Sequence, residues 1–331
     1  MLVWIVFILF VLVLLALDLG VFHRRAHVVS VREALTWTVV WMVTAIAFAV
    51  FIFFGYEHHW LGMGLAPDAV DRSAAFPDGR INDPQSAVLK FLTGYLVELS
   101  LSADNVFVIA MLFEYFAIPK TYQHRVLFWG ILGALAMRGG MIAIGAQLVV
   151  QFAWVLSVFG VILVVTALKM MFMNTEAADP SRNVVVRLMR RFLPLTDQFH
   201  GEQFFVKTDR WILTPLVPAL VMIEITDLVF AVDSIPAIFA ITADPFLVFT
   251  SNVFAILGLR SLYFVLAGAL SVFKYLKTAL ALVLLTVGAK MLAHSWLEEI
   301  LGPHFNLYLL AVVVAILGTA VLASLIDRRR T

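Results

Sequence analysis

Apolar residues gather along the chain in nine long runs, separated by shorter stretches rich in polar residues. The runs lie at about 2–22, 34–54, 88–116, 126–147, 152–173, 213–242, 249–270, 278–297 and 306–326. A helix needs about 20 apolar residues to cross the hydrocarbon core of a bilayer, and each run approaches or exceeds this length. The pattern predicts an all-α transmembrane protein with nine membrane-spanning helices. The first run has no basic segment before it and is too long for the apolar core of a signal peptide, so we expect it to remain as an anchor.

The composition agrees with this class and excludes several others. Hydrophobic residues make up 63% of the 331 residues, charged residues make up 14%, and the mean hydropathy is +0.99. A soluble domain has about 45–50% apolar and about 25% charged residues. The chain has no cysteine, which excludes thiolate nucleophiles, zinc–thiolate sites and iron–sulfur clusters. A net charge of +1 provides no basic surface for nucleic acid, so the expected partner is the lipid bilayer.

The basic residues predict the orientation in the membrane. With the N-terminus outside, 16 of the 23 lysines and arginines fall on the inner side and 3 on the outer side. Cytoplasmic loops carry an excess of lysine and arginine, so we expect an N-out, C-in orientation. The four remaining bases lie inside spans or at their ends: Arg138, Lys169, Arg260 and Lys290. The two lysines are near span ends and are expected to snorkel towards the interface.

Two connecting segments are longer than the others. The outer one, 55–87, carries four aspartates and three prolines and is predicted to be a solvated connector. The inner one, 174–212, contains a basic amphipathic stretch from Arg182, which is expected to lie along the anionic inner leaflet. Two β-prone runs around Thr208–Asp209 predict a small hairpin. If the protein has a protein partner, the cytoplasmic loop 174–212 is its expected docking surface.

Two segments of the chain share one order of charged residues. Glu98-Leu-Ser-Leu-Ser-Ala-Asp-Asn105 aligns without gaps with Asp227-Leu-Val-Phe-Ala-Val-Asp-Ser234, and an arginine and then a lysine follow in both. Each copy would contain three spans, and an odd number of spans places the two copies in opposite orientation. Such inverted repeats are typical of transporters with a site near the bilayer midplane. We therefore divide a single membrane domain, 1–331, into two N-terminal helices (1–54), repeat 1 (88–173), repeat 2 (213–297) and a C-terminal helix (306–326).

Acidic residues inside the spans are the candidate functional groups. Each ionised group at the bilayer centre costs about 2.5–3.5 kcal/mol on insertion scales, so some interaction must offset that cost. Because the acids outnumber the bases available at their depth, we interpret them as ligands of a cation. All the donor atoms are oxygens, which suits Mn²⁺, Ca²⁺ or Mg²⁺. The candidate metal ligands are Glu98, Asp104, Asn105, Glu224, Asp227 and Asp233.

Other residues are expected to support this site. They are Ser102 and Ser234 as further ligands, and Arg138 and Arg260 as charge partners. Pro236 removes one backbone hydrogen bond and is expected to break the helix beside Asp233. In the alternative interpretation, the acids pair with the two arginines and only hold the helices together.

Three motifs carry a resemblance to a known family: Glu98 to Phe107, Glu224 to Ile238, and Phe249 to Tyr263. In these motifs the sequence resembles the TerC/Alx family, within the LysE-type exporter superfamily, and its length is most similar to the Alx-type branch. The resemblance implies a multi-pass manganese exporter of the bacterial inner membrane, historically grouped with tellurite-resistance proteins. It implies Mn²⁺ as the transported ion, no permanently bound cofactor, and the six candidate ligands as the ion site.

Two other functions stay open beside Mn²⁺ efflux. An intramembrane aspartyl protease would use Asp104 and Asp233 as two close carboxylates sharing a proton, but the expected Gly-x-Gly-Asp context is absent. A non-transporting membrane partner would support stress or tellurite resistance, or metal loading of exported proteins, and would dock through 174–212. Of the three, efflux explains both the repeat and the excess of acids, so no enzymatic activity is expected.

Overall fold

Nine α-helices form within the described part of the chain, one in each of the apolar runs. A computed structural model describes residues 2–17, 30–72, 78–152, 154–172, 194–196, 198–207, 211–267, 275–293, 297 and 305–328. The helices are α1 (Leu2–Leu17), α2 (Val31–Glu57), α3 (Pro84–Tyr115), α4 (Lys120–Gln151), α5 (Trp154–Phe172), α7 (Leu216–Phe239), α8 (Pro245–Ala267), α9 (Leu276–Leu292) and α11 (Phe305–Arg328). The predicted helical class is confirmed.

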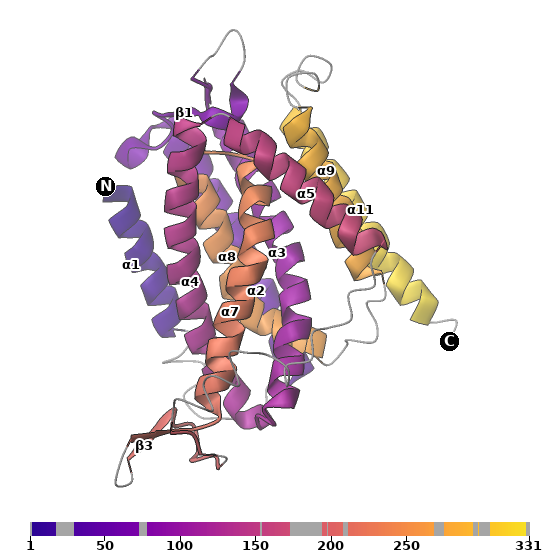
Figure 1. Ribbon diagram of the computed structural model, residues 1–331. Coiled ribbons are helices and arrows are strands. Elements are labelled where there is room, and N and C mark those ends of the chain that lie inside the picture. Colours follow the sequence, from indigo (N-terminus) through magenta and orange to yellow (C-terminus); the bar gives the residue numbers. More distant parts are fainter. Residues whose placement is uncertain are drawn as a thin grey trace.

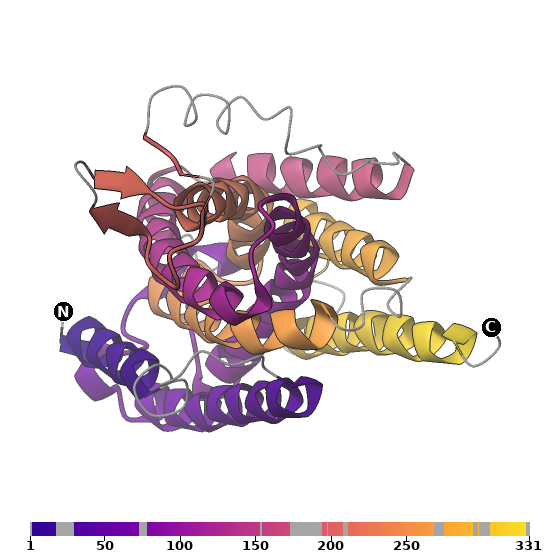
Figure 2. The same ribbon diagram turned by 90° about the horizontal axis from the view of Figure 1, so that it is seen from below.

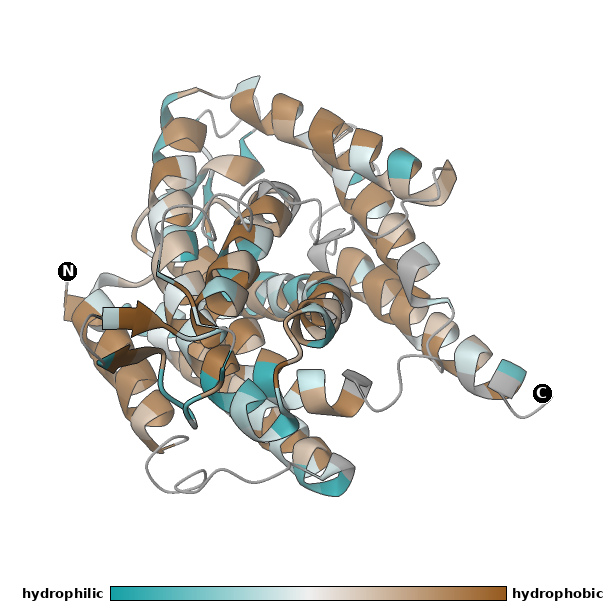
Figure 3. Cartoon of the chain, turned by 60° about the horizontal axis from the view of Figure 1, so that its bottom comes forward, coloured by the Kyte–Doolittle hydropathy of each residue, from teal (hydrophilic) through white to brown (hydrophobic). Residues whose placement is uncertain are grey.

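Five of these helices contain a stretch that is long and apolar enough to cross a membrane: α2, α4, α5, α8 and α11. On α2, α4, α5 and α11, large apolar side chains are exposed on the outer faces, whereas most of α8 is buried. Val43 on α2, Val165 on α5 and Leu322 on α11 are 58%, 58% and 60% exposed, and Figure 3 shows the helices as predominantly hydrophobic. Soluble proteins rarely expose apolar surface of this extent, so lipid is the surrounding that it fits. That all nine helices span the membrane, with the N-terminus outside, stays a prediction.

Local chemistry sets where two of the long helices begin. At the start of α2, the Ser30 hydroxyl accepts a hydrogen bond from the backbone nitrogen of Glu33 at 3.2 Å. At the start of α3, the Asp83 carboxylate accepts one from the backbone nitrogen of Ser86 at 2.7 Å, and Pro84 occupies the first helical position. Such side chains pair amides that the first turn leaves without a partner, and proline has no amide to pair.

The helices of the two predicted repeats pack across each other. α3 and α4 each pack against both α7 and α8, while α5 packs against α9 (Figure 1 and Figure 2). The first helix of each unit therefore contacts the second helix of the other, and the third helices contact one another. A two-fold relation between 88–173 and 213–297 would produce these pairs, although the inverted repeat itself stays a prediction. α2 and α11 pack on the outside of α3.

Glycines allow α5 and α9 to approach closely. A Cβ added at Gly288 would lie 3.1 Å from the carbonyl oxygen of Gly160 and 3.0 Å from the Cβ of Leu163. Small residues at helix contacts in membranes permit close van der Waals packing, which drives association where lipid is as apolar as the side chains. A larger residue at either glycine would push the two helices apart.

The segment between α2 and α3 is folded, so the prediction of a solvated connector holds only in part: Asp78 and Asp83 are exposed, but Asp68 is buried. It contains two 3₁₀ turns, η2 (Trp60–Gly62) and η3 (Ala69–Asp71), and two short strands, β1 (Pro67–Asp68) and β2 (Arg80–Ile81), that pair antiparallel. Asp68 is 0% exposed. The sequence did not indicate the burial of Asp68, because some of the donors that surround it come from residues distant in the sequence.

The predicted hairpin is confirmed. β3 (Phe205–Lys207) pairs antiparallel with β4 (Trp211–Leu213), and an ion pair of 3.1 Å between Arg125 and Glu202 holds this region to α4. The β1–β2 and β3–β4 pairs lie at opposite ends of the helix bundle (Figure 1), as expected for loops on opposite sides of a membrane. The turn at Thr208–Asp209 and the basic stretch from Arg182 fall outside the described residues.

Candidate functional site

The centre of the candidate site is the guanidinium of Arg138 on α4, a residue that is 2% exposed. Its Nε and Nη2 atoms donate to the two carboxylate oxygens of Asp227 on α7, at 3.1 Å and 2.8 Å. This two-point geometry is the strongest form of charge-assisted hydrogen bond that a protein side chain makes. Arg138 therefore fixes the position of Asp227 in the interior of the bundle.

Arg138 also holds the first acid of the other predicted repeat. Its Nη1 atom donates to Oε1 of Glu98 on α3, a residue that is 0% exposed. Ser102, one turn further along α3, donates to the same oxygen at 3.4 Å. One guanidinium thus bridges Glu98 and Asp227, the two residues that align in the sequence repeat. For these two acids, the structure shows the ion pairing that the alternative interpretation predicted.

Two neutral side chains complete the surroundings of Nη1. The hydroxyl of Ser234 on α7 and the amide oxygen of Asn252 on α8 each accept a hydrogen bond from Nη1 at 3.4 Å. Sequence reasoning did not select Asn252, which is 1% exposed. The available signal was an amide inside an otherwise apolar helix, in one of the motifs that carried the family resemblance. We call the group formed by Arg138, Glu98, Asp227, Ser234 and Asn252 the Arg138 cluster. It joins four helices, α3, α4, α7 and α8.

Three acceptor oxygens in this region are buried without a hydrogen-bond donor among the residues that the structure describes. They are Oε2 of Glu98, Oδ1 of Asn105 and Oε2 of Glu224. The amide nitrogen of Asn105 donates to Asp227 at 3.3 Å, and because an ionised carboxylate only accepts, the amide oxygen must face the other way. Leaving a buried acceptor unpaired costs about 1–3 kcal/mol, and more for a charged group. These oxygens are therefore available for a cation or a water molecule.

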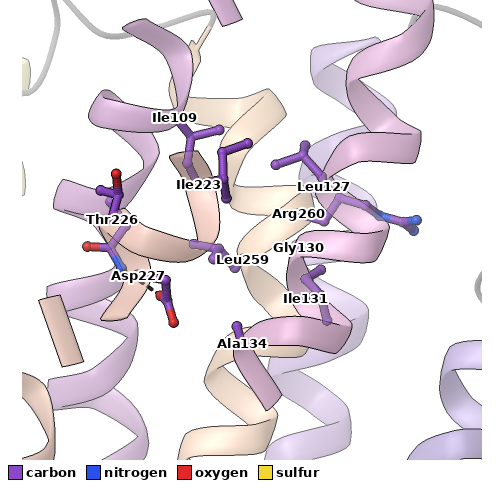
Figure 4. A pocket seen from close by; sticks show the side chains of 11 residues that line it. Ile109, Leu127, Gly130, Ile131, Ala134, Ile223, Thr226, Asp227, Leu259 and Arg260 are labelled. Carbon is purple, nitrogen blue, oxygen red and sulfur yellow. Dashed lines mark hydrogen bonds between the residues drawn. The ribbon is translucent and has the colours of Figure 1, made fainter. Parts of the chain in front are cut away.

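A small cavity lies beside these residues. Its volume is about 20 Å³, and a cavity needs about 10–15 Å³ to hold one water molecule. Its polar lining consists of Asn105, Thr226, Asp227 and Arg260, and the remaining lining is apolar. In Figure 4, the Asp227 carboxylate and the Arg260 guanidinium extend to opposite sides of the view. The space fits one small particle between α3, α4, α7 and α8.

Glu224 packs directly on the backbone of α4. A Cβ at Gly133 would collide with the carboxylate of Glu224. Glycine is therefore required at position 133 for Glu224 to keep this position, which the sequence analysis did not foresee. The only available signal was the recurrence of glycine in the Ile131-Leu-Gly and Ile256-Leu-Gly sequences.

The predicted site residues are only partly placed by the structure. Glu98, Asn105 and Asp227 come together with Ser102, Ser234 and Arg138, whereas Arg260 lines the cavity from α8. The side chains of Asp104 and Asp233 fall outside the described part. Within that part, no three histidine, aspartate or glutamate side chains are grouped so as to hold a metal ion. The six metal ligands therefore stay a prediction.

The predicted break at Pro236 is wrong, because α7 continues through it to Phe239. Pro236 lies in the last turn of the helix, and its missing amide removes one hydrogen bond, that to the carbonyl of Val232. The helix recovers at once, since the backbone nitrogen of Ala240 donates to the carbonyl of Pro236 at 2.9 Å. A proline within a helix removes one hydrogen bond and crowds the carbonyl four residues before it, which can bend a helix without ending it.

The prediction that both lysines snorkel is wrong for Lys290, which is 3% exposed. Its Nζ atom donates to the carbonyl oxygen of Ala240, at the C-terminal end of α7, at 2.5 Å. A cation is stabilised there by the carbonyl groups that the last turn leaves unpaired. Lys169, its counterpart in repeat 1, is exposed. The two lysines that align in sequence therefore differ in their surroundings.

A second buried cluster lies at the end of the bundle that carries β1 and β2. The Nζ atom of Lys90 on α3 donates to Asp68 at 2.8 Å, to Asp71 at 2.5 Å and to Asn82 at 2.6 Å. Asp68 also accepts from the backbone nitrogen of Ala243, at 2.7 Å, in the turn between α7 and α8. Burial alone would raise the pKa of Asp68, but Lys90 and the hydrogen-bond donors outweigh it and lower this pKa to about 2. One carboxylate therefore ties the outer segment to both α3 and the α7–α8 turn.

A further carboxyl group lies in that turn. Burial, together with the nearby negative charge of Asp68, raises the pKa of Asp244 above its usual value. The hydroxyl of Tyr56 on α2 donates a hydrogen bond of 2.7 Å to Asp244 and opposes this effect. α2 is therefore anchored to the same end of the bundle.

The helical bundle, its apolar outer surface and its buried charges define a multi-pass integral membrane protein. The chain matches the family model described as "Integral membrane protein TerC family" over residues 83–331, and it belongs to that family. The resemblance seen in the sequence motifs is thereby confirmed.

Several curated relatives match almost the whole chain. It is 44% identical to the "Uncharacterized membrane protein STKORF319" of Myxococcus xanthus, over 98% of this chain and 92% of that one. It is 43% identical to a protein of Photorhabdus laumondii, over 88% and 86% of the two chains. It is 40% identical to a protein of Escherichia coli K12, over 95% and 94%. The last two carry the name "Putative membrane-bound redox modulator Alx". No solved structure matches the chain.

Proposed function

We propose that this protein exports a divalent metal cation, Mn²⁺ in the first place, across the bacterial inner membrane. The observation that carries the proposal is the set of buried oxygens of Glu98, Asn105 and Glu224 that find no donor among the described residues. Buried polar groups are normally paired, and each exception calls for an explanation such as an ion. Asn105 also lines a cavity in which one small particle fits.

The chemistry of the donor set supports a hard cation. Carboxylate and amide oxygens are ligands for Mn²⁺, Mg²⁺ and Ca²⁺, whereas copper and zinc favour nitrogen and sulfur. Glu98 and Asp227 together bring more negative charge than the guanidinium of Arg138, which pairs with both, neutralises. A divalent cation would offset this excess and would satisfy the remaining oxygens.

The arrangement of the helices supports transport more than permanent binding. The acids of the Arg138 cluster lie on α3 and α7, the first helices of the two predicted repeats. In transporters built from inverted repeats, the site lies near the midplane where the repeats meet, and rocking of one unit against the other exposes it to each side. The packing of α3 and α4 against α7 and α8, across the two predicted repeats, is consistent with such a mechanism.

The name of the Alx relatives suggests a link to redox balance. The 331 residues of this chain contain no cysteine, so a thiol–disulfide exchange on this chain cannot provide that link. Export of Mn²⁺, a redox-active metal ion, would change the redox state of a cell without any thiol chemistry. The proposal therefore accommodates the name of those relatives without an enzymatic step on this chain.

The proposal is tested with the purified full chain in proteoliposomes that enclose a Mn²⁺-sensitive dye. We expect wild-type protein to admit Mn²⁺, and Glu98→Gln and Asp227→Asn each to slow the flux by about tenfold or more, corresponding to at least about 1.4 kcal/mol. The matched control is Glu114→Gln, the same substitution at an exposed position on the same helix, which should keep the wild-type flux. Mg²⁺ and Ca²⁺ measured in the same vesicles give the selectivity.

Two results would contradict this function. One is a wild-type flux no greater than that of protein-free liposomes. The other is full flux in both Glu98→Gln and Asp227→Asn, since the proposed site cannot work without these carboxylates. Asp104 and Asp233, which the sequence also nominates, are tested by Asn substitutions in the same assay.

A further inference from the structure

Arg138 occupies the place that the proposed function assigns to the transported ion. Its guanidinium lies between Glu98 and Asp227, the two acids that a transported ion would bridge. An ion and the guanidinium cannot both occupy this place at full bonding, because Arg138 already takes both oxygens of Asp227 and one of Glu98. Either Arg138 holds these acids permanently, or it gives way when an ion binds.

The bonding favours exchange. Arg138 leaves Oε2 of Glu98 without a partner among the described residues, so the guanidinium satisfies the carboxylates only in part. Two of its contacts, to Ser234 and Asn252, are 3.4 Å long. Bonds of this length are weak, so Nη1 is held mainly by Glu98. A cation that also engaged the unpaired oxygen would bind the acids more completely than Arg138 does.

We infer that Arg138 is a tethered cation, which takes the place of the transported ion between Glu98 and Asp227 when no ion is bound. The inference rests on the proposed function and assigns Arg138 a role in the return of the empty carrier. Enclosing two carboxylates at the centre of the bilayer without a counter-charge is costly, and buried acids left without their partner are strongly unfavourable. With the guanidinium between them, the empty site keeps its charge partly balanced while the carrier reorients.

The inference predicts that two transport modes separate. In exchange of labelled for unlabelled Mn²⁺, the carrier reorients only with ion bound, so Arg138 is not needed to neutralise the acids. In net transport, the carrier must return empty. We therefore expect Arg138→Gln to slow net Mn²⁺ transport by about tenfold or more, while exchange stays within about threefold of wild type. Arg138→Lys, which keeps the charge, should restore part of the net transport.

The experiment measures both modes in proteoliposomes made from the same preparation of the full chain. Arg125→Gln is the matched control, because it removes an arginine from the same helix at a position that is 41% exposed and outside the cluster. Gel filtration and a thermal unfolding curve show whether Arg138→Gln is folded. If it is not, Arg138→Lys carries the test. Its ammonium cannot reproduce the two-point contact with Asp227, so net transport should fall more than exchange.

Each outcome of the two transport measurements either supports or overturns the role of Arg138. Loss of net transport with exchange retained supports the inference. Loss of both modes by a folded variant overturns it, since Arg138 would then be needed for binding or for the framework. Retention of both modes also overturns it. If wild-type protein performs neither mode, the proposed function fails and the inference falls with it, whereas failure of the inference alone leaves wild-type transport intact.

Discussion

Lys90 and Arg138 are both cationic side chains buried among acids, and their hydrogen-bonding groups are satisfied to different degrees. Nζ of Lys90 has three hydrogen-bond acceptors for its three donors, on Asp68, Asp71 and Asn82. Arg138 also bridges two acids, but one oxygen of Glu98 is left unpaired within the described residues. We call the group formed by Lys90, Asp68, Asp71 and Asn82 the Lys90 cluster.

A buried network with all its polar groups paired and one with an unpaired oxygen have different consequences for a protein. In a medium of low dielectric constant, a fully satisfied network stiffens the fold, whereas an unpaired polar group costs free energy. The Lys90 cluster meets the first condition and connects the outer segment to the bundle. The Arg138 cluster meets the second, which is the expected state of a site that completes its bonds with a bound ion.

The largest effect is expected from removing the cation of the satisfied cluster. Lys90→Met leaves Asp68 buried without its main partner, and loss of one member of a buried ion pair costs about 3–5 kcal/mol. Thermal unfolding of the detergent-purified protein should show this as a marked drop in Tm. Lys120→Met, at an exposed position, is the control and should leave the Tm nearly unchanged. A small drop for Lys90→Met would show that the cluster is not structural.

The second largest effect is expected when Mn²⁺ is added to a variant of the Arg138 cluster. Arg138→Gln leaves Glu98 and Asp227 without their guanidinium, and a bound ion can take its place. A ligand at 100 times its Kd stabilises a protein by about 2.7 kcal/mol, so added Mn²⁺ should raise the Tm of Arg138→Gln clearly. The same addition should do less for Arg138→Gln/Glu98→Gln, which lacks one of the two acids. An equal rise in both variants would argue against an ion between these acids.

Acid should weaken the Lys90 cluster through Asp68. Its pKa of about 2 lies below the value of about 3.9 for an unfolded aspartate. The ionised form therefore contributes about 2–3 kcal/mol of stability above about pH 5, which is lost progressively as the pH falls from about 5 towards about 1. Unfolding curves at a series of pH values should show this loss in wild type and a smaller one in Asp68→Asn. Asp78→Asn, at an exposed position, should follow wild type. A wild-type profile shared by Asp68→Asn would exclude this role.

The smallest effect is expected at Ser234. Its hydroxyl accepts a hydrogen bond of 3.4 Å from Arg138, which has stronger partners, so Ser234→Ala should cost no more than about 0.5 kcal/mol. Net Mn²⁺ transport should change little. A large loss of transport in Ser234→Ala, with an unchanged Tm, would show that this hydroxyl binds the ion and would revise the set of ligands.

The sequence was sufficient to predict the elements but not the pairing of their charges. Length and hydropathy of the apolar runs predicted the helices, and alternation around Thr208–Asp209 predicted the hairpin. The repeat singled out Glu98 and Asp227, and the arginine that follows in each copy. That Arg138 bridges both acids depends on how α3, α4 and α7 pack, which a linear pattern does not contain.

Errors arose where partners lie far apart in the chain. Asp68 resembles a solvated loop residue until Thr242 and Ala243 are brought beside it. Lys290 resembles a snorkelling lysine until the end of α7 presents its carbonyl group. The missing amide of Pro236 predicted a break, but the loss of one hydrogen bond can bend a helix without ending it, and α7 continues to Phe239.

The attachment of Asp68 has a consequence for any opening of the bundle at the β1–β2 end. Asp68 binds Lys90 on α3 and Ala243 in the α7–α8 turn at once, so separating these two elements must break at least one of these buried bonds. Packed interfaces are bistable and do not deform continuously. We therefore expect this end of the bundle to switch between a closed and an open form, with little gradual widening between them.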